Sequence, residues 1–357
     1  SGGGRCNLTN SCWEISDLVS NYPRGEKQLI GLFNRFSTID AFDWFQSKGL
    51  SLKIEKDGRV FPNSDSSEEV IKCLTSVAKK LGIKVFTNSH VKKVTIQQEG
   101  YNLFVKGNKF FEAKNILICT GGHPSGRRLA KSLGHSIVHP VPSLFSLSTS
   151  EKSLTSCSGI TLNVHAELTV NKKKYAETGS ILITHKGFSG PVVLRLSAFS
   201  ARNLYLNKYK GELRINWLCM SENEVRKKLD LYKLENGKKV VINNKPFHNL
   251  PRGLWRALLL TLNIDSKLKW ADLSKSQIYS IVKCLIMNSY LINSRGPYGE
   301  EFVTAGGVSL DEINFKTMES KICEGLFFAG EVLNIDGVTG GFNFQHCWTS
   351  AWVAGNG

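Results

Sequence analysis

The C-terminal part of the sequence brings together the residue types that a nucleotide cofactor requires. An apolar run, 326–329, leads into Gly330 and the carboxylate of Glu331, and a glycine-rich loop follows. A carboxylate at the end of a strand accepts hydrogen bonds from the hydroxyl groups of a ribose or a ribityl chain. Gly340 and Gly341 have no Cβ, so the backbone can approach a planar ligand closely. These features favour a cofactor site over a plain strand-loop-helix corner in which glycine only makes the turns.

A helix is predicted over residues 342–354, directly after this loop. The first N–H groups of a helix have no partner within it, and they lie at the positive end of the helix dipole. A flavin gains negative charge at its pyrimidine edge on reduction, so a helix that begins there favours the reduced form. The loop and the helix together predict a flavin site.

Two further glycine-rich segments have the composition of a cofactor site. A Thr-Gly-Gly tripeptide, 120–122, ends the apolar run 116–119, although many parallel strands end in glycine. In residues 1–7, glycines expose backbone N–H groups, and Arg5 can bind a phosphate or a flavin carbonyl with two hydrogen bonds. These residues lack the strand before and the helix after that define a phosphate loop, so a disordered segment is the alternative.

The sequence assigns no catalytic residue, and His185 and Cys6 are its candidates. A single histidine is more often a surface or core residue than a proton-transfer group. Cys6 follows Arg5, whose charge could lower the pKa of the thiol. No second thiol is evident for a redox pair, which favours a structural or flavin-side role for Cys6. Nine cysteines without a C-x-x-C pattern predict free thiols in the cytosol and no metal site.

The segments between these motifs predict a doubly wound α/β domain. A helix over 66–81 begins with a capping-box pattern and is followed by a strand over 83–86. A β-meander is expected over 91–113. The apolar run 115–119 indicates a central parallel strand that is buried on both faces.

Two insertions of different class interrupt this domain. The FAD-binding domain is expected to comprise 1–143 and 305–357, and an inserted β-barrel-like domain 144–220 and 288–304. A small helical insert is expected over 221–287. Its candidate helices are 222–231, 254–262 and 275–286.

The composition is that of a globular protein, with 41% hydrophobic and 21% charged residues and a formal net charge of +16. Such a charge can serve nucleic-acid binding or a lysine-rich solvated surface. The basic clusters are dispersed and lack interleaved aromatic residues, which favours the solvated surface. We therefore expect a small-molecule substrate and no nucleic-acid partner. No apolar run is long enough to cross a membrane, and a cytoplasmic location is expected.

Several motifs resemble one family of flavoproteins. They are SGGGRCNLTN at 1–10, ICTGGHPSG at 118–126, THKGFSGPVVLRLS at 184–197, FVTAGGVSLDEINFKTMES at 302–320 and GLFFAGEVLNIDGVTGGFNFQ at 325–345. In this order they span nearly the whole chain. The sequence resembles the bacterial NAD(P)/FAD-dependent oxidoreductases of the aminoacetone-oxidase-like and bile-acid-reductase-like type.

The resemblance implies an FAD domain of the glutathione-reductase type, with an inserted β-barrel and a small helical insert. It implies FAD as the cofactor, with NAD(P)H as a candidate electron donor. By position, the residues near FAD are Gly3, Gly4, Arg5, Cys6, Asn7, Asn10, Val91, Thr120, Gly121, Gly122, Gly330, Glu331, Gly340, Gly341, Phe342 and Asn343. Among these, the Val91 backbone faces the adenine, Glu331 takes the acidic position before the flavin, and residues 340–343 contact its ring.

The family opens with a strand, a G-x-G-x-x-G turn and a second strand that ends in an acid. No G-x-G-x-x-G occurs in residues 1–357, so an N-terminally truncated FAD domain is expected. The predicted function is an FAD-dependent oxidoreductase that acts on a small organic substrate by hydride or electron transfer. The alternatives are a flavoprotein-like protein without activity and a basic protein associated with nucleic acid.

Overall fold

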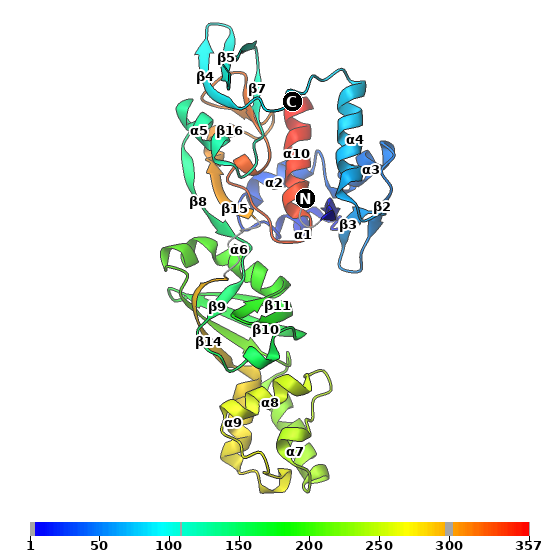
Figure 1. Ribbon diagram of the computed structural model, residues 1–357, viewed down its shortest axis with the longest axis vertical. Coiled ribbons are helices and arrows are strands. Elements are labelled where there is room, and N and C mark those ends of the chain that lie inside the picture. The colour runs from blue at the N-terminus through cyan, green and yellow to red at the C-terminus, as the bar shows by residue number, and fades with distance from the viewer. Residues whose placement is uncertain (1–3, 108, 297–302, 357) are drawn as a thin grey trace. The chain divides into compact units, whose positions relative to one another are not determined.

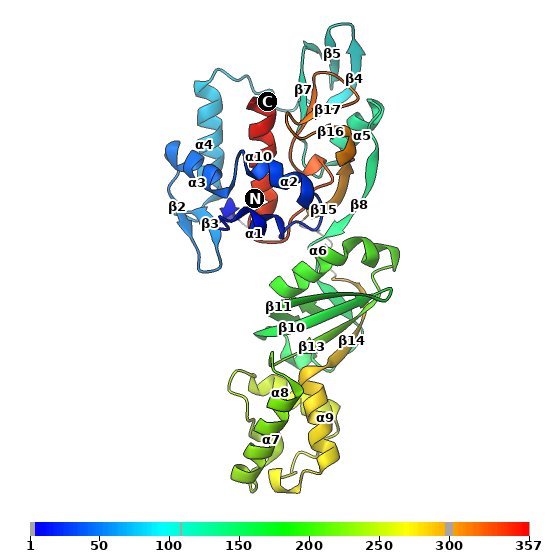
Figure 2. The same ribbon diagram turned by 180° about the vertical axis from the view of Figure 1, so that it is seen from behind.

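The computed structural model describes residues 4–107, 109–296 and 303–356. The chain divides into two compact units, of which the first consists of residues 1–141 and 303–357 and the second of residues 142–302. Figures 1 and 2 show the helices and strands of each unit from opposite sides.

The first unit is a Rossmann-like α/β domain in which segments distant in the sequence pair with one another. β7 (Ile116–Ile118) and β18 (Leu326–Phe328) are parallel, and they belong to a four-stranded sheet in the order β16-β17-β18-β7. Because parallel strands end at the same edge, the residues that follow β7 and β18 lie side by side. This edge carries the predicted cofactor motifs.

Antiparallel strands complete the first unit, and they include the predicted meander β4-β5-β6, which is confirmed. The other sheets have the orders β1-β3-β2 and β15-β8. The strands are β1 (Thr9–Asn10), β2 (Leu52–Ile54), β3 (Arg59–Pro62), β4 (Val91–Gln97), β5 (Gly100–Val105), β6 (Lys109–Ala113), β8 (Ile137–Ser143), β15 (Val303–Val308), β16 (Ile313–Asn314) and β17 (Glu319–Ser320).

Helices from both ends of the chain pack together in this unit, since α10 contacts α2, α3 and β1. The helices are α1 (Ile15–Val19), α2 (Glu26–Phe33), α3 (Thr38–Ser47), α4 (Ser67–Lys80), α5 (Pro124–Ser132), η5 (Leu310–Glu312), η6 (Gly330–Val332) and α10 (Phe342–Asn356). The predicted helices over 66–81 and 342–354 are thus confirmed within two residues at each end.

The surroundings of α4 differ from the prediction. Ser66 makes no side-chain cap hydrogen bond, so the predicted capping box does not form. The strand expected over 83–86 is absent, and Val85 has an exposed fraction of 73%. The apolar residues of the predicted helix are not all buried. Val70 is buried, whereas Leu81 is 71% exposed. The periodicity identified the helix correctly, but a strand needs a neighbouring strand, and segment 83–86 pairs with none among the described residues.

The prediction that the run 115–119 is a central strand was also wrong. β7 pairs with β18 on one side and lies at the edge of the described sheet. The side chain of Leu117 is 44% exposed, whereas Ile118 on the opposite face is buried. An apolar run indicates a preference for burial, but it does not identify the strand that would provide it.

The second unit contains a closed barrel with the strand order β10-β11-β12-β9-β14-β13, which confirms the predicted barrel. Its strands are β9 (Leu147–Thr149), β10 (Thr161–Val170), β11 (Lys173–Thr184), β12 (Gly187–Ser189), β13 (Gly211–Asn216) and β14 (Asn288–Arg295). The sequence analysis missed α6 (Pro191–Leu206), which packs on β11 and starts with proline at its first position.

Three α-helices follow the barrel strand β13 along the chain. They are α7 (Glu222–Asn236), α8 (Arg252–Thr261) and α9 (Lys275–Ile286), with the short helices η3 (Val241–Asn243) and η4 (Trp270–Asp272) between them and η2 (Thr155–Cys157) earlier in the unit. All three predicted helices are present, and the bounds of α9 agree with the prediction. Their apolar faces share one core with the barrel, and residues 221–287 belong to the second unit.

Within the described parts of the chain, no helix has the length and apolar character needed to cross a membrane. All nine cysteines are free thiols. No group of three or more potential metal ligands occurs among the described residues.

Candidate cofactor site

The parallel strands β7 and β18 place two glycine-containing segments at one edge of their sheet. Residues 119–122 follow β7, and Gly330 and Glu331 follow β18. The Glu331 carboxylate lies over the glycines, because a Cβ added to Gly121 would be 3.7 Å from Glu331 Oε2 and one added to Gly122 would be 4.0 Å away. The structure therefore brings together Gly121, Gly122, Gly330 and Glu331, which the sequence analysis placed in one site.

Glu331 is a half-buried carboxylate with a hydrogen-bond donor beside it. Burial raises the pKa of Glu331, and a hydrogen bond from the Gly122 backbone N–H opposes that rise. A carboxylate that is partly removed from water accepts a hydrogen bond from a hydroxyl group more strongly than one in bulk water. The edge can therefore bind a ligand that carries hydroxyl groups.

Helix α5 starts directly after this edge and fixes its shape. Arg127 Nη1 donates a hydrogen bond to the Gly122 carbonyl at 2.7 Å. Thr120 needs the glycine at position 126, because a Cβ there would be 1.9 Å from Thr120 Oγ1. The side chains of Cys119 and Thr120 are exposed, so this part of the edge is open to solvent.

The glycines at 340 and 341 have a different role from the one expected. A Cβ on Gly341 would be 2.3 Å from the backbone oxygen of Thr9, and one on Gly340 would be 2.7 Å from the Phe342 ring. Asn10 Nδ2 donates to the Gly340 carbonyl at 2.9 Å. These contacts show that the glycines allow the loop to pack closely against β1. Their predicted contact with a flavin ring stays a prediction.

The other predicted residues of this loop also bind the chain itself. The Asn7 amide can donate to Thr9 O at 3.1 Å and accept from the Gly341 N–H at 2.9 Å. Asn343 closes the loop through two hydrogen bonds to the Gly337 backbone, at 2.8 and 2.9 Å. Phe342 is buried, with its ring 6.1 Å from that of Tyr22. The structure therefore joins Asn7, Asn10 and the loop 337–343 into one connected framework.

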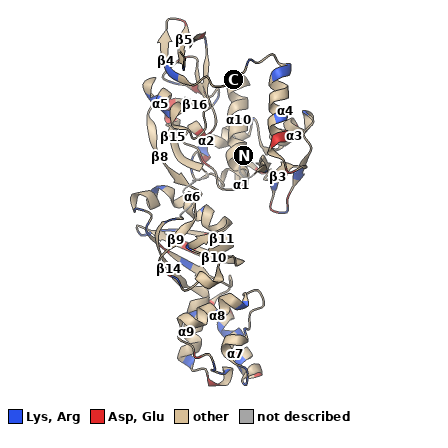
Figure 3. Cartoon of the chain, in the orientation of Figure 1, with Lys and Arg blue, Asp and Glu red and all other residues tan. Residues whose placement is uncertain are grey.

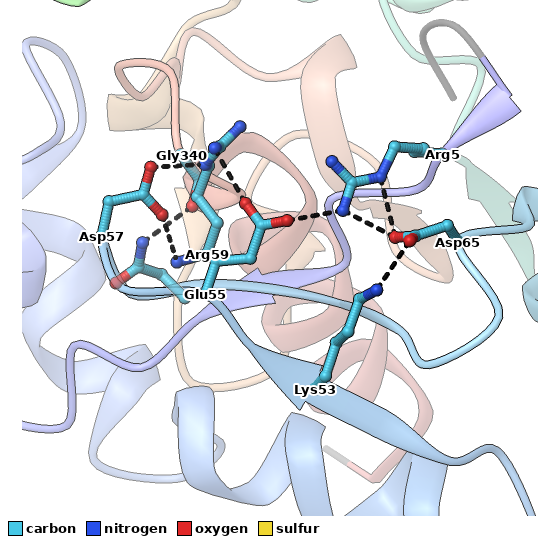
Figure 4. A network of polar contacts seen from close by, with 8 residues as sticks. Arg5, Lys53, Glu55, Asp57, Arg59, Asp65 and Gly340 are labelled. Atoms are coloured by element: carbon cyan, nitrogen blue, oxygen red, sulfur yellow. Dashed lines mark hydrogen bonds and ion pairs between the residues drawn. The ribbon is translucent and has the colours of Figure 1, made fainter.

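Arg5 takes part in an ion-pair network, which Figure 4 shows. Its guanidinium group contacts Glu55 at 2.5 Å and Asp65 at 2.6 Å, and it lies 4.0 Å from the centre of the Phe61 ring. Both carboxylates raise the pKa of Arg5 through hydrogen bonds. The network fixes the segment around Arg5 to the β2–β3 hairpin, and the predicted contact of Arg5 with a flavin stays a prediction.

The possibility that Arg5 lowers the pKa of the Cys6 thiol is not borne out. Cys6 is buried with 4% exposure, and burial raises the pKa of its thiol instead of lowering it. The neighbouring Arg5 forms ion pairs with Glu55 and Asp65. Cys6 packs in a small core with Leu8 and Phe45, which supports the structural alternative.

The remaining predicted residues are Gly3, Gly4, Val91 and His185. Gly3 lies outside the described residues. Gly4 has a φ of +81° with open space around it, and Val91 starts β4 opposite Val105. His185 is an exposed residue in the turn between β11 and β12 of the second unit, so its predicted catalytic role is untested.

A buried ion pair that was not predicted from the sequence lies beside the loop. Asp336 is fully buried and accepts two hydrogen bonds from the guanidinium group of Arg24, which is itself 13% exposed. The negative charge of Asp336 adds to the rise in the pKa of Glu331. The two residues are 312 positions apart, and no local pattern signals their pairing.

His346 on α10 is a second buried polar group. Its side chain is fully buried, and neither ring nitrogen has a hydrogen-bond partner. Burial lowers the pKa of His346 to about 4, so the ring is neutral at pH 7. The next residue, Cys347, lies beside Gly330, since a Cβ there would be 3.2 Å from its sulfur.

Comparison with known proteins identifies the family of this chain. The family model described as the HI0933-like protein Rossmann domain matches residues 1–357. The chain belongs to the HI0933-like Rossmann-domain family. The predicted membership in a family of NAD(P)/FAD-dependent oxidoreductases is thereby confirmed.

Curated relatives of this family member carry two kinds of name. The chain is 27% identical over 363 residues to a 3-dehydro-bile acid delta(4,6)-reductase of Clostridium scindens, covering 99% of this chain and 87% of the relative. It is 28% identical over 366 residues to a ribosomal RNA dihydrouridine synthase of Haemophilus influenzae, with the same coverage. A ribosomal RNA dihydrouridine synthase of Escherichia coli is 28% identical over 372 residues, covering 99% of this chain and 86% of the relative.

Proposed function

We propose that this protein is an FAD-dependent reductase of carbon–carbon double bonds conjugated to a carbonyl group. The observation that carries the proposal is the edge of β7 and β18, where a half-buried Glu331 faces two glycines in a family of Rossmann-domain oxidoreductases. The family assignment supports a flavin, and the names of the relatives support the reaction class.

The two kinds of relative share one type of chemistry. A delta(4,6)-reductase of a 3-dehydro bile acid acts on double bonds conjugated to the ketone at position 3. Dihydrouridine differs from uridine by two hydrogens across a ring double bond that is conjugated to a carbonyl group. Both products arise when a hydride and a proton add across such a bond. Bound FAD, once reduced by NAD(P)H as the proposed electron donor, would supply the hydride.

The residues of this chain would bind and orient the cofactor. Glu331 would accept a hydrogen bond from a hydroxyl group of FAD. Gly121 and Gly122 would leave room beside α5 for the pyrophosphate and the ribityl chain of FAD. Asn7 and Asn10 would act through the loop 337–343, whose position they fix. We also propose that the first unit is an FAD-binding domain of the glutathione-reductase type.

The proposal is tested with the full natural polypeptide that contains residues 1–357. NAD(P)H added without oxygen should bleach the visible absorbance of bound oxidised flavin, and a conjugated ketone added next should restore it. A flavin that is reoxidised by oxygen but by neither a conjugated ketone nor a uridine-containing RNA would contradict the proposed reaction.

A glycine substitution tests the role of the edge. Gly122→Ala would place a methyl group 3.4 Å from Thr304 Oγ1 and 4.0 Å from Glu331 Oε2, which the fold tolerates but which fills the edge. We expect a rate of flavin reduction at least about tenfold lower, equivalent to about 1.4 kcal/mol. Gly31→Ala on α2 is the matched control, because a Cβ there meets no atom within 4 Å. Equal rates of flavin reduction in both variants would show that the edge of β7 and β18 is not part of the cofactor site.

A second candidate substrate is a uracil base in RNA. Two relatives are named ribosomal RNA dihydrouridine synthases, and the second unit carries 24 Lys and Arg residues against 12 Asp and Glu residues, a net charge of +12. The small-molecule substrate expected from the sequence remains the first candidate. Assays of a 3-oxo steroid and of unmodified ribosomal RNA with the same enzyme would distinguish the two.

A further inference from the structure

The helical segment 221–287 of the second unit has a large excess of positive charge. It contains 13 Lys and Arg residues and six Asp and Glu residues, and all of it is described by the structure. Figure 3 shows basic positions on all three of its helices. Ten of the cations are exposed and form no ion pair: Arg226, Lys227, Lys228, Lys238, Lys239, Arg252, Arg256, Lys267, Lys269 and Lys275.

The ion pair that this segment does form is internal to its helix packing. Lys283 on α9 contacts Glu222 on α7 at 2.7 Å. Lys233 and Lys245 instead donate to backbone carbonyls. Exposed charges in ordinary surfaces are of mixed sign, which limits repulsion between them. An unpaired excess in one segment indicates a surface for a polyanion.

Four of these lysines gather where two loops meet, and we name them the lysine cluster: Lys238, Lys239, Lys267 and Lys269. An antiparallel bridge joins Val240 to Lys269, and the Trp270 N–H donates to Lys239 O at 2.9 Å. The fully buried Trp270 ring fixes this junction, since its Nε1 donates to Asn244 O at 3.1 Å. The backbone of the cluster is therefore held before any ligand binds.

Helices α8 and α9 carry basic residues and no acidic residue. Arg252 and Arg256 lie one turn apart on the exposed face of α8. On α9, Tyr279 is 50% exposed and lies between Lys275 and Lys283, with Lys283 Nζ 5.3 Å from its ring centre. An exposed aromatic ring flanked by lysines can stack on a base while the lysines contact phosphates. The position of this ring corrects the expectation that no aromatic residue lies between the basic residues.

We propose that segment 221–287 is an RNA-docking surface. The lysine cluster and the arginines of α8 contact phosphates, and Tyr279 stacks on an unpaired base. The proposal rests on the second candidate substrate of the proposed function, a uracil base in RNA, and it names the surface that would hold that RNA. It also revises the expectation that the protein has no nucleic-acid partner. Salt-dependent affinity follows, because each phosphate contact releases condensed cations from the RNA.

The experiment measures binding of a fluorescein-labelled single-stranded RNA by anisotropy at several salt concentrations, using the full natural polypeptide. The variant replaces the lysine cluster by alanine (K238A/K239A/K267A/K269A). We expect the slope of log K against log salt to fall in magnitude by about 3, at about 0.7 per lost phosphate contact. At moderate salt, the dissociation constant should rise about 10- to 100-fold.

The matched control replaces four exposed lysines of the first unit by alanine (K79A/K80A/K92A/K93A), and it should retain the wild-type slope. Tyr279→Leu should weaken RNA binding about tenfold and leave the slope unchanged, because stacking involves no counterion release. Near-ultraviolet circular dichroism of each variant monitors the fold.

Three results would overturn the proposal: an unchanged slope in the lysine-cluster variant, an equal loss in the control variant, or tighter binding to phosphatidylserine vesicles than to RNA at the same salt. Reduction of a conjugated ketone is measured on the same proteins. Ketone reduction without RNA binding would reject the docking surface and leave the proposed reaction standing. RNA binding by segment 221–287 without flavin reduction would reject the proposed reaction and leave the docking surface standing.

Discussion

The two units of this protein place their polar groups in opposite ways. The first unit has a net charge of only +4, from 22 Lys and Arg and 18 Asp and Glu residues, whereas the second has +12. Buried polar residues of the first unit include Asp336, Gln345 and His346, whereas those among the described residues of the second unit are all serines. Buried polar groups cost stability unless they are paired, as Asp336 is with Arg24. The second unit keeps an apolar core and carries its charge on the surface.

The largest expected effect comes from removing a charge inside the first unit. Arg24→Met removes the guanidinium group from the fully buried Asp336, and we expect the free energy of unfolding to fall by about 3 to 5 kcal/mol. Lys174→Met in the second unit breaks an exposed pair with Glu167 and should cost less than about 1 kcal/mol. Denaturant titrations monitored by tryptophan fluorescence measure both.

A double variant sharpens this comparison. Arg24→Met combined with Asp336→Leu removes both charges, so most of the lost stability should return. If Arg24→Met and Lys174→Met destabilise equally, the contrast between a polar interior and a charged surface does not hold.

A somewhat smaller effect concerns the pH dependence of the first unit. The pKa of His346 is about 4 in the folded protein and near 6.5 when unfolded, so between these values the unfolded chain binds a proton that the folded chain does not. Stability therefore falls as pH drops from 6.5 to 4, by about 3 kcal/mol from this residue. His346→Leu should flatten this part of the curve.

The control for His346 is a histidine of the second unit. His185 is exposed, so His185→Leu should leave the pH dependence as it is in the wild type. An unaltered acid limb in His346→Leu would show that the buried ring is not the group responsible.

The sequence predicts those features that depend on neighbouring residues. α9 begins with a capping box of Ser274 and Gln277 and presents an apolar stripe, and its bounds agree with the prediction. Gly330 and Glu331 follow an apolar run that is indeed the strand β18, whose parallel partner β7 brings Gly121 and Gly122 to the same edge. Turn and periodicity signals suffice for such elements.

Features that depend on distant partners could not be predicted. The close contact of Gly341 with Thr9 and the pairing of Arg24 with Asp336 join opposite ends of the chain. β7 has the composition of a central strand but lies at the edge of the described sheet, because composition does not select a neighbour. Tyr279 is different, because the predicted helix 275–286 already places it one turn from Lys275 and from Lys283.

The most direct test of the flavin site is a titration of the full natural polypeptide with FAD, followed by quenching of flavin fluorescence. We predict saturable binding that Glu331→Gln weakens about 10- to 100-fold through the loss of a charge-assisted hydrogen bond, about 1.5 to 3 kcal/mol. The exposed Glu324→Gln, in the same unit, should bind as the wild type does. Equal affinity of all three proteins for FAD, or no binding by any of them, would contradict the assignment.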